Sequence, residues 1–400
     1  MKYTKDEVLE YVREEDVKFI RLAFCDVRGR QKNISVMPDE LGRAFDGGIP
    51  FYPDAVPGYE GEGSLTLCPD PSTLSVLPWR PEHGRVVRMY STVALQSGKP
   101  HPADTRSLLR EAAQDAEKKG LRFHFGAQQT FYLFRLDGDG QPTKIPYDHA
   151  GYMDLAPEDR GENIRREICL TLEQMGIRPA SSHHEEGPGQ NKIDFRFSDA
   201  LEAADHAMTF QTVVRTAAYR NGLWADFSPK PLTDCPGNGC HINLSLESLG
   251  GYTARGEALG AAAAGILDGI AAMTAFLNPT EDSYKRLGGR RAGIAWSGTD
   301  RSRLLYMPAG AHRAELRSPD PGTNPYLAFA LLVRAGLKGI EKGLALPEEN
   351  EETGKLPRTL SEARTAAAQS AFIAESLPQV VREAYGVRPE TEAAGNQSEG

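Results

Sequence analysis

Alternation of apolar and polar residues marks the first hundred residues of the chain. Val17–Phe24 and Gln31–Val36 carry β-branched and aromatic residues on either side of a turn at Arg28–Arg30, which predicts a pair of strands. Leu65–Leu67 and Val86–Val93 predict further strands, separated by segments rich in proline and glycine. The N-terminal part is therefore expected to be rich in β-structure.

Beyond residue 100, helical and strand patterns mix. A helix is predicted to begin near Asp104 or Thr105, because Leu108, Leu109 and Ala112 then share one apolar face. Further strands are predicted at Phe123–Phe134, Ile193–Phe197 and His241–Leu246, and further helices at Asn163–Gln174, Ala200–Tyr219, Ala258–Leu277 and Pro325–Lys342. This order is not a regular alternation of strand and helix, so an α+β fold is expected rather than a doubly wound sheet.

Length and composition divide the chain into parts. Four hundred residues, of which 40% are hydrophobic and 25% charged, indicate a globular protein of two domains. We expect an N-terminal domain over residues 1–100, a larger domain over 101–387, and a polar, disordered tail over 388–400.

Net charge, apolar runs and cysteine content argue against several classes of partner and location. A net charge of −9 disfavours a nucleic-acid partner and an anionic membrane surface. The longest apolar run, around Leu259–Ile270, is interrupted by Asp268, and the N-terminus has no apolar signal core, so no membrane association and a cytoplasmic location are expected. The five scattered cysteines contain no CxxC pair and are expected to be free thiols.

One segment suggests chemistry by itself. Ser181–Phe195 reads SSHHEEGPGQNKIDF, with adjacent histidines and glutamates beside a Gly-Pro turn. Such residues can be metal ligands on a strand and loop. Taken alone, however, the segment is better explained as a solvated polar loop.

The surrounding sequence indicates that this segment belongs to a known protein family. The segment closely resembles the HHE–PGQ–E–ID signature of class I glutamine synthetases. Further segments resemble the family in the same order along the chain: Val17–Val36, Asp148–Ile177, Ala204–Asp205, Phe227–Pro231, Gly237–His241, Asn278–Leu287, Ile294–Ser302 and Arg313–Ala330. Because the matches extend from about residue 15 to 385, the chain is identified by resemblance as a member of the glutamine synthetase family.

The resemblance implies a glutamine synthetase fold. The family combines an N-terminal β-grasp domain with a larger catalytic-type domain, in which helices flank a curved antiparallel sheet. Subunits form homo-oligomeric hexameric rings, often stacked in pairs, with each active site between neighbours. The implied chemistry is ATP-dependent amide formation through γ-glutamyl phosphate, with Mg²⁺ or Mn²⁺ neutralising the phosphate charge. Glutamate, or another small anion, is the implied ligand.

The implied metal site is depleted in this sequence. The family's Glu-x-Glu pair matches Gln128 and Thr130, and a third glutamate position is occupied by Lys192. The remaining ligand positions keep their residues, which are Glu185, His241 and Glu315. A lysine ammonium repels a divalent ion, so metal binding is doubtful. Lys192 is expected to act as an internal counter-ion beside Glu185, or alternatively to extend into solvent while metal binds.

Other family positions are retained or loosely matched. Arg301, Arg313 and Arg317 match arginines that grip phosphate or carboxylate, and Gly237 and Gly239 match the glycines beside the ligand. The arginines could instead form structural salt bridges.

Two parts of the family's ammonium site are weakened. The segment from the adjacent subunit that binds ammonium is matched only loosely, by Asp54. The family's Tyr-Glu loop is replaced by the short connection Gly288–Gly293, which has no carboxylate.

Three functions remain open from the sequence. The first is a pseudoenzyme, or a protein of strongly altered activity, for which another glutamine synthetase is a candidate partner. The second is an active ATP-dependent ligase that joins glutamate to ammonia or an amine. The third is a different, metal-free reaction that uses Lys192, although neighbouring carboxylates would keep the pKa of that lysine too high for this role. The sequence favours the first because phosphoryl transfer without metals has little else to neutralise its charge.

Overall fold

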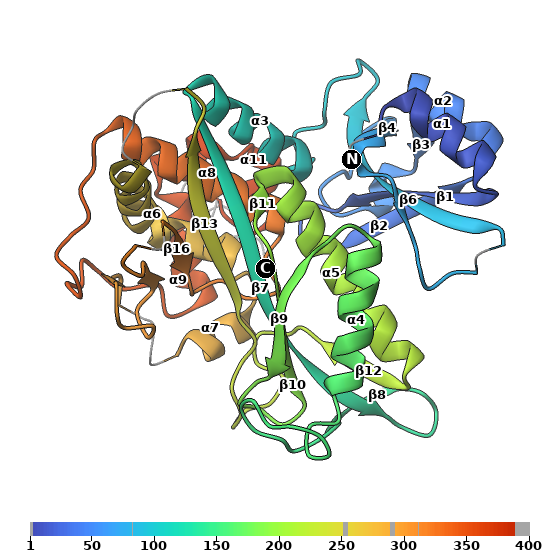
Figure 1. The fold of residues 1–400 in the computed structure, drawn as a ribbon. Coiled ribbons are helices and arrows are strands. Elements are labelled where there is room, and N and C mark those ends of the chain that lie inside the picture. The colour runs from blue at the N-terminus through green and yellow to red at the C-terminus, as the bar shows by residue number, and fades with distance from the viewer. Residues whose placement is uncertain (1–2, 82, 251–254, 289–292, 311, 389–400) are drawn as a thin grey trace, which may run out of the picture.

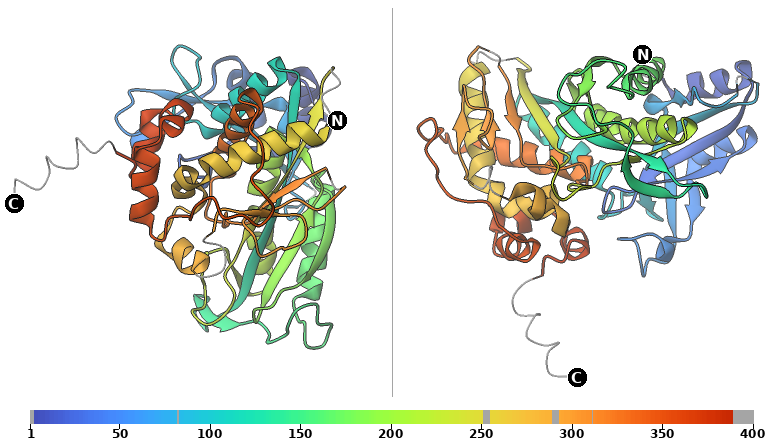
Figure 2. Two further views of the ribbon diagram at one scale, coloured as in Figure 1. Left: turned by 90° about the vertical axis from the view of Figure 1, so that its left-hand side faces the viewer. Right: turned by 90° about the horizontal axis from the view of Figure 1, so that it is seen from below.

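Two β-sheets and the helices around them make up the molecule (Figures 1 and 2). The computed structural model describes residues 3–81, 83–250, 255–288, 293–310 and 312–388. Most of the predicted tail and the centre of the predicted short connection at 288–293 lie outside these ranges.

The N-terminal domain is a six-stranded sheet of order β2-β1-β6-β4-β3, with β5 on β6 (Figure 1). Its central neighbours β1 and β6 are parallel, although they are far apart in sequence. Its main elements are α1 (Lys5–Glu14), β1 (Val17–Cys25), β2 (Gln31–Val36), α2 (Leu41–Gly47), β3 (Ile49–Phe51), β4 (Leu65–Pro69), β5 (Ser75–Val76) and β6 (Arg85–Leu95). The predicted strands are therefore confirmed, whereas α1 was not predicted even though Thr4 and Glu7 form a capping box.

The larger domain contains a ten-stranded sheet of order β14-β15-β16-β13-β7-β10-β9, in which β8, β11 and β12 also pair with β7. All pairs are antiparallel except β14 with β15. The strands are β7 (Leu121–Leu136), β8 (Pro142–Pro146), β9 (Pro179–His184), β10 (Gln190–Phe195), β11 (Ser198–Asp199), β12 (Leu223–Asp226), β13 (Cys240–Ser248), β14 (Trp296–Ser297), β15 (Leu305–Tyr306) and β16 (Ala314–Leu316). The predicted strand Ile193–Phe197 was wrong in its bounds, because the pairing with β7 begins at Gln190.

The larger domain also contains helices, some of which pack on the sheet. They are α3 (Thr105–Lys118), α4 (Glu162–Gln174), α5 (Ala200–Arg220), α6 (Arg255–Leu277), α7 (Glu281–Leu287), α8 (Pro325–Glu341), α9 (Leu360–Ala368), α10 (Ala371–Ser376) and α11 (Gln379–Ala384). α3 and α5 pack directly on β7, and α8 packs on both of them. The structure thus confirms an α+β fold.

Strand β7 fixes which side chains face the helices and which face the other side. Its odd-numbered residues from 121 to 133 are all buried, whereas several even-numbered ones are partly exposed. Phe125 stacks on Phe329 of α8, and Phe131 contacts Phe210 of α5. Since side chains alternate along a strand, Gln128 lies on the face away from these helices.

Helix α6 is the described helix that is long and apolar enough to cross a membrane. Residues Gly256–Leu277 meet that criterion, but 67% of the most apolar window is buried inside the fold. The helix packs on α8 and α9. Burial within the protein therefore accounts for its apolar composition.

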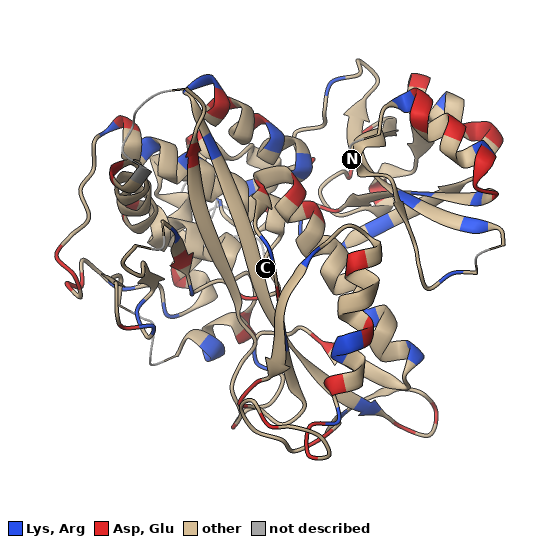
Figure 3. Ribbon diagram, viewed as in Figure 1, with Lys and Arg blue, Asp and Glu red and all other residues tan. Residues whose placement is uncertain are grey.

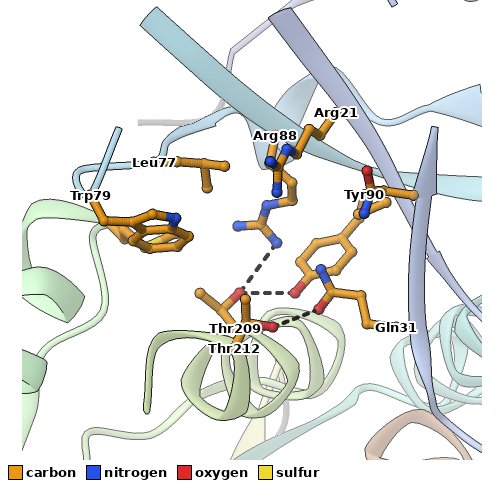
Figure 4. A pocket seen from close by; sticks show the side chains of 11 residues that line it. Arg21, Gln31, Leu77, Trp79, Arg88, Tyr90, Thr209 and Thr212 are labelled. Carbon is orange, nitrogen blue, oxygen red and sulfur yellow. Dashed lines mark hydrogen bonds between the residues drawn. The ribbon is translucent and has the colours of Figure 1, made fainter. Parts of the chain in front are cut away.

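Hydrogen bonds join the N-terminal sheet to helix α5. Arg88 and Tyr90 of β6 both reach the Thr209 hydroxyl, at 3.2 and 2.9 Å, and Thr212 donates to the Gln31 side chain at 3.2 Å (Figure 4). These contacts surround a cavity of about 170 Å³. The two domains are thus held together by directional contacts.

A buried ion network lies at the same junction. The Arg106 guanidinium donates to both carboxylate oxygens of Asp205, at 3.0 and 2.9 Å, and to Asp70 at 3.0 Å. Burial by itself would raise the pKa of Asp70, but the charge of Arg106 and hydrogen bonds from Ser72 and Arg106 outweigh it and lower this pKa. Asp70 therefore stabilises the fold in its ionised form.

Replacing Asp70 by asparagine should cost about 1–2 kcal/mol of unfolding free energy at pH 7. Because the folded state lowers the pKa of Asp70, its contribution is complete above the unfolded pKa of about 3.9 and disappears as pH falls below it. Urea unfolding of both proteins at pH 7 and near pH 3 tests this, with the substitution Asp115→Asn at a partly exposed position as the control. A difference that is equally large at both pH values would contradict it.

Candidate functional site

The predicted ligand positions gather on the face of the large sheet away from α3, α5 and α8. In the strand register, Gln128 lies opposite His241, and Thr130 lies opposite Lys192. Lys192 in turn lies opposite His183 of β9. Side chains at opposed positions of antiparallel strands point to the same side, so Gln128, His241, Thr130 and Lys192 lie on one face of the sheet.

Three basic side chains lie beside the carboxylate of Glu315 on β16. One carboxylate oxygen lies 3.2 Å from His241 Nδ1 and forms an ion pair with Arg317, and the other lies 3.8 Å from Arg313. Arg313 also donates to the Asn243 side chain. Burial by itself would raise the pKa of Glu315, but the hydrogen bond from His241 and the charges of His241, Arg317 and Arg313 lower it to about 2. Two of the three predicted anion-binding arginines thus hold a protein carboxylate.

Lys192 also has a carboxylate neighbour within the site. Its ammonium lies 3.8 Å from Asp194 Oδ1, and only 16% of its side chain is exposed. Glu185 forms its ion pair with His183, at 3.4 Å. Lys192 therefore lies within the site rather than extending into solvent, and it pairs with Asp194 instead of the predicted Glu185.

The glycine loop before β13 is fastened to β7. The Thr130 hydroxyl accepts a hydrogen bond from the Gly239 amide at 2.8 Å, and the Gly239 carbonyl accepts one from the Thr130 amide at 3.0 Å. A Cβ on Gly237 would lie 2.5 Å from the Pro229 carbonyl and 2.8 Å from Arg286. Only glycine fits at position 237. Close packing against Pro229 and Arg286 therefore requires a glycine there, whether or not a ligand binds beside it.

Arg301 lies at the exposed rim of the sheet. Its guanidinium sits 5.1 Å from the centre of the Tyr306 ring. Tyr306 pairs in register with Glu315 and so belongs to the same face. Tyr306 therefore supports Arg301 by a cation–π contact.

Asp54 lies in the N-terminal domain, whereas the other predicted site residues lie in the larger domain. It is exposed on a short 3₁₀ turn (Pro53–Ala55) between β3 and β4, and its carboxylate accepts a hydrogen bond from the Gly61 amide at 2.8 Å. The remaining candidates lie on the large sheet or on segments beside it. Within one chain Asp54 is therefore part of the N-terminal domain and not of this face.

The two carboxylates retained at candidate ligand positions have cationic or histidine partners. Mg²⁺ and Mn²⁺ require several carboxylate or carbonyl oxygens free to coordinate, whereas Glu315 and Glu185 are engaged by these side chains. Residues 125–134 of β7 include no Lys, Arg, Asp or Glu, and this part of the strand is tan in Figure 3. In the part of the chain that the structure describes, one group of ligand atoms has metal-like spacing, and it lies elsewhere: Asp148, Asp159 and His184.

That second group is a structural network. Arg165 holds Asp159 by two hydrogen bonds, and Asp148 accepts hydrogen bonds from His184 at 2.9 Å and from the Gly189 amide at 2.9 Å. These bonds fasten the turn between β9 and β10. The two adjacent histidines of the HHEE segment therefore have different roles. His184 belongs to the structural network, whereas His183 lies on the same face of the sheet as the candidate site.

Sequence reasoning missed Arg286, Asp194 and Asn243. Arg286 packs beneath the glycine loop and donates to the Ser318 carbonyl at 2.7 Å. The Asn278–Leu287 motif contains Arg286, but its role depends on a contact 32 residues away. Period-two alternation could have placed Asp194 beside Lys192, and Asn243 beside His241.

Comparisons with known proteins define the class. The family model described as glutamine synthetase, β-Grasp domain, matches residues 16–96, and that described as glutamine synthetase, catalytic domain, matches residues 102–398. The chain belongs to the glutamine synthetase family, which confirms the resemblance. Members of this family use ATP and divalent cations.

Particular relatives agree with this assignment. The chain is 41% identical to glutamine synthetase of Methanosarcina mazei, with 96% of this chain and 92% of the relative aligned. It is 40% identical to glutamine synthetase of Clostridium saccharobutylicum, covering 88% and 83%. Among solved structures, apo GmaS without ligand superposes with a TM-score of 0.87 at 28% identity, and a GmaS/ADP complex with 0.86 at 27%; each comparison covers 98% of this chain and 96% of the other.

Proposed function

We propose that this chain is a glutamine synthetase-like protein that has lost metal-dependent ligation and binds a small anion, such as glutamate, at the same face of the sheet. The observation that carries the proposal is the environment of Glu315, which is surrounded by His241, Arg317 and Arg313. A divalent ion would have to displace these groups. Within the site, the carboxylates Glu185, Asp194 and Glu315 are balanced by the cations Lys192, Arg313 and Arg317.

Phosphoryl transfer needs strong neutralisation of the developing phosphate charge, and metals normally supply it. A face whose fixed charges already cancel does not concentrate divalent cations. It can still hold an anion, because a guanidinium presents five donors and its ion pair uses only some of them. Arg301, which stacks on Tyr306 at the rim, keeps its donors toward solvent.

The proposal includes assembly. We propose a homo-oligomeric ring of the family type in the cytoplasm, in which Asp54 faces a neighbouring copy's site. The exposed position of Asp54 in the N-terminal domain supports this arrangement. A complex with another, intact glutamine synthetase is a further possible assembly, which co-purification with such a protein would test.

Activity measurements test the proposal. With glutamate, ATP, hydroxylamine and Mg²⁺ or Mn²⁺, the protein should form γ-glutamyl hydroxamate at least about 1000-fold more slowly than an intact relative. The Methanosarcina mazei enzyme, measured in the same buffers, is the positive control. Metal-dependent turnover within about tenfold of that control would contradict the proposal.

A second candidate is an active ATP-dependent ligase for ammonia or another amine. The names of the relatives at 41% and 40% identity favour it. Calorimetric titration with Mg²⁺ and Mn²⁺, with and without ATP, separates the two functions. Tight, nucleotide-dependent metal binding supports the ligase, whereas absence of metal binding together with glutamate binding supports the metal-free site.

A further inference from the structure

A second cavity, of about 610 Å³, lies between the β1–β2 turn, α5 and the C-terminal helices. Its volume is within the range of small-molecule sites, about 300–1000 Å³. We call it the arginine cavity, because Arg28, Arg30, Arg215 and Arg364 line it.

The arginine cavity is separate from the candidate site. Gln211, which lines it, donates to the Gln129 side chain at 2.8 Å and to the Pro321 carbonyl at 3.0 Å. Gln129 points to the helix-covered face of β7, whereas its neighbours Gln128 and Thr130 point to the opposite face. The two sites thus share strand β7 but lie on its two sides.

The charge of the lining is entirely positive. No aspartate or glutamate is among the residues that line the arginine cavity. Over the described ranges, none of the four guanidinium groups forms an ion pair. Arg28 and Arg364 instead donate to the backbone carbonyls of Ala384 and Tyr385, at 3.0 and 2.8 Å. Because each guanidinium has five N–H donors, most remain for a ligand.

Local structure holds two of the arginines at the cavity. The buried Asp26 carboxylate accepts hydrogen bonds from the backbone amides of Arg28 and Arg30, at 3.0 and 2.9 Å. Between them, Gly29 has a φ of +80° and lies so close to Asn324 that a Cβ would clash at 2.8 Å. The turn is therefore fixed in shape and docked on the larger domain, which reduces the ordering entropy lost on binding.

Arg215 of α5 is held in place by an aromatic ring. Its guanidinium lies 4.9 Å from the centre of the Phe227 ring, an arrangement that leaves its edge donors available. The side chains come from separate segments of the chain and converge without a protein carboxylate between them.

We propose that the arginine cavity binds a small anion that carries two or more neighbouring negative groups. Guanidinium groups recognise phosphate and carboxylate through paired hydrogen bonds, so both kinds of anion share the required chemistry. Pyrophosphate and citrate serve as probes to distinguish phosphate from carboxylate ligands. The proposal is independent of whether the candidate site on the other face is catalytic.

Calorimetric titration of the full chain with each probe, at low ionic strength, tests the site. Arg30→Gln, which removes an exposed side chain at the cavity, should weaken binding about tenfold, and Arg215→Gln should do the same. Arg43→Gln is the matched control, because Arg43 is an exposed arginine of the N-terminal domain paired with Glu40. Thermal unfolding of each variant verifies that it folds.

The outcomes separate this site from the candidate site. Loss of affinity in Arg30→Gln and Arg215→Gln, with Arg43→Gln and Arg301→Gln unchanged, supports the arginine cavity. Binding that Arg301→Gln abolishes and Arg30→Gln preserves would place the anion on the other face and overturn the proposal. No binding of either probe at millimolar concentration, or equal weakening by Arg43→Gln, would also overturn it.

Discussion

Replacing Gln128 and Lys192 by glutamate should raise the affinity of the site for Mg²⁺ and Mn²⁺ by at least about 100-fold. Both positions lie on the same face as His241 and Thr130 in the strand register. The change removes the ammonium that repels a divalent ion and adds two carboxylates at positions where the family has them. Calorimetric titration with each metal, with and without ATP, measures the effect.

The control has the same change in charge at a remote position. Gln114→Glu with Lys118→Glu alters two exposed residues one turn apart on α3 and should leave metal affinity unchanged. If the site variant binds metal no better than this control, then the pairing of Glu315 with Arg317 and Arg313, and not Lys192, excludes the metal.

Thr130 is left in place for a structural reason. From the sequence it is a lost ligand, but its hydroxyl accepts the Gly239 amide hydrogen bond at 2.8 Å. A glutamate there would have to preserve that bond to keep the glycine loop on β7. The two-residue variant therefore separates metal affinity from loop geometry better than a triple replacement would.

The fold could be predicted from the sequence wherever one face of an element is buried. Strand β7 shows why, since its buried odd-numbered residues form a period-two pattern. Helix α8 likewise follows from its apolar run and from Asn324, whose side chain caps its first turn. Such patterns depend on residues close in sequence.

The ion pairs between charged side chains in the candidate site could be predicted only in part. The sequence identified Lys192, Glu185 and Glu315, but which cation faces which carboxylate depends on strand register. Glu315 meets His241 because β16 lies beside β13, and Lys192 meets Asp194 because both alternate to the same face of β10. The arginine cavity was not predicted, because its arginines are spread from residue 28 to residue 364.

The buried network at the domain junction should be the most sensitive point of the fold. Asp205 accepts two hydrogen bonds from Arg106 and one from the Tyr326 hydroxyl at 2.6 Å. All three residues are buried. Removing the Asp205 carboxylate leaves the Arg106 charge with Asp70 as its remaining partner within hydrogen-bond distance, and breaking such a buried pair is strongly destabilising.

Asp205→Ala should therefore lower the unfolding free energy by about 3–5 kcal/mol, measured by urea unfolding at neutral pH. Tyr326→Phe, which removes one hydrogen bond and keeps the ion pair, should cost only about 1–2 kcal/mol. Asp115→Ala, at a partly exposed residue of α3, is the control and should change stability by less than about 0.5 kcal/mol. If Asp205→Ala is no worse than Tyr326→Phe, Asp70 alone is sufficient to neutralise Arg106. The junction would then be held mainly by apolar packing and by the bonds from Arg88 and Tyr90 to Thr209.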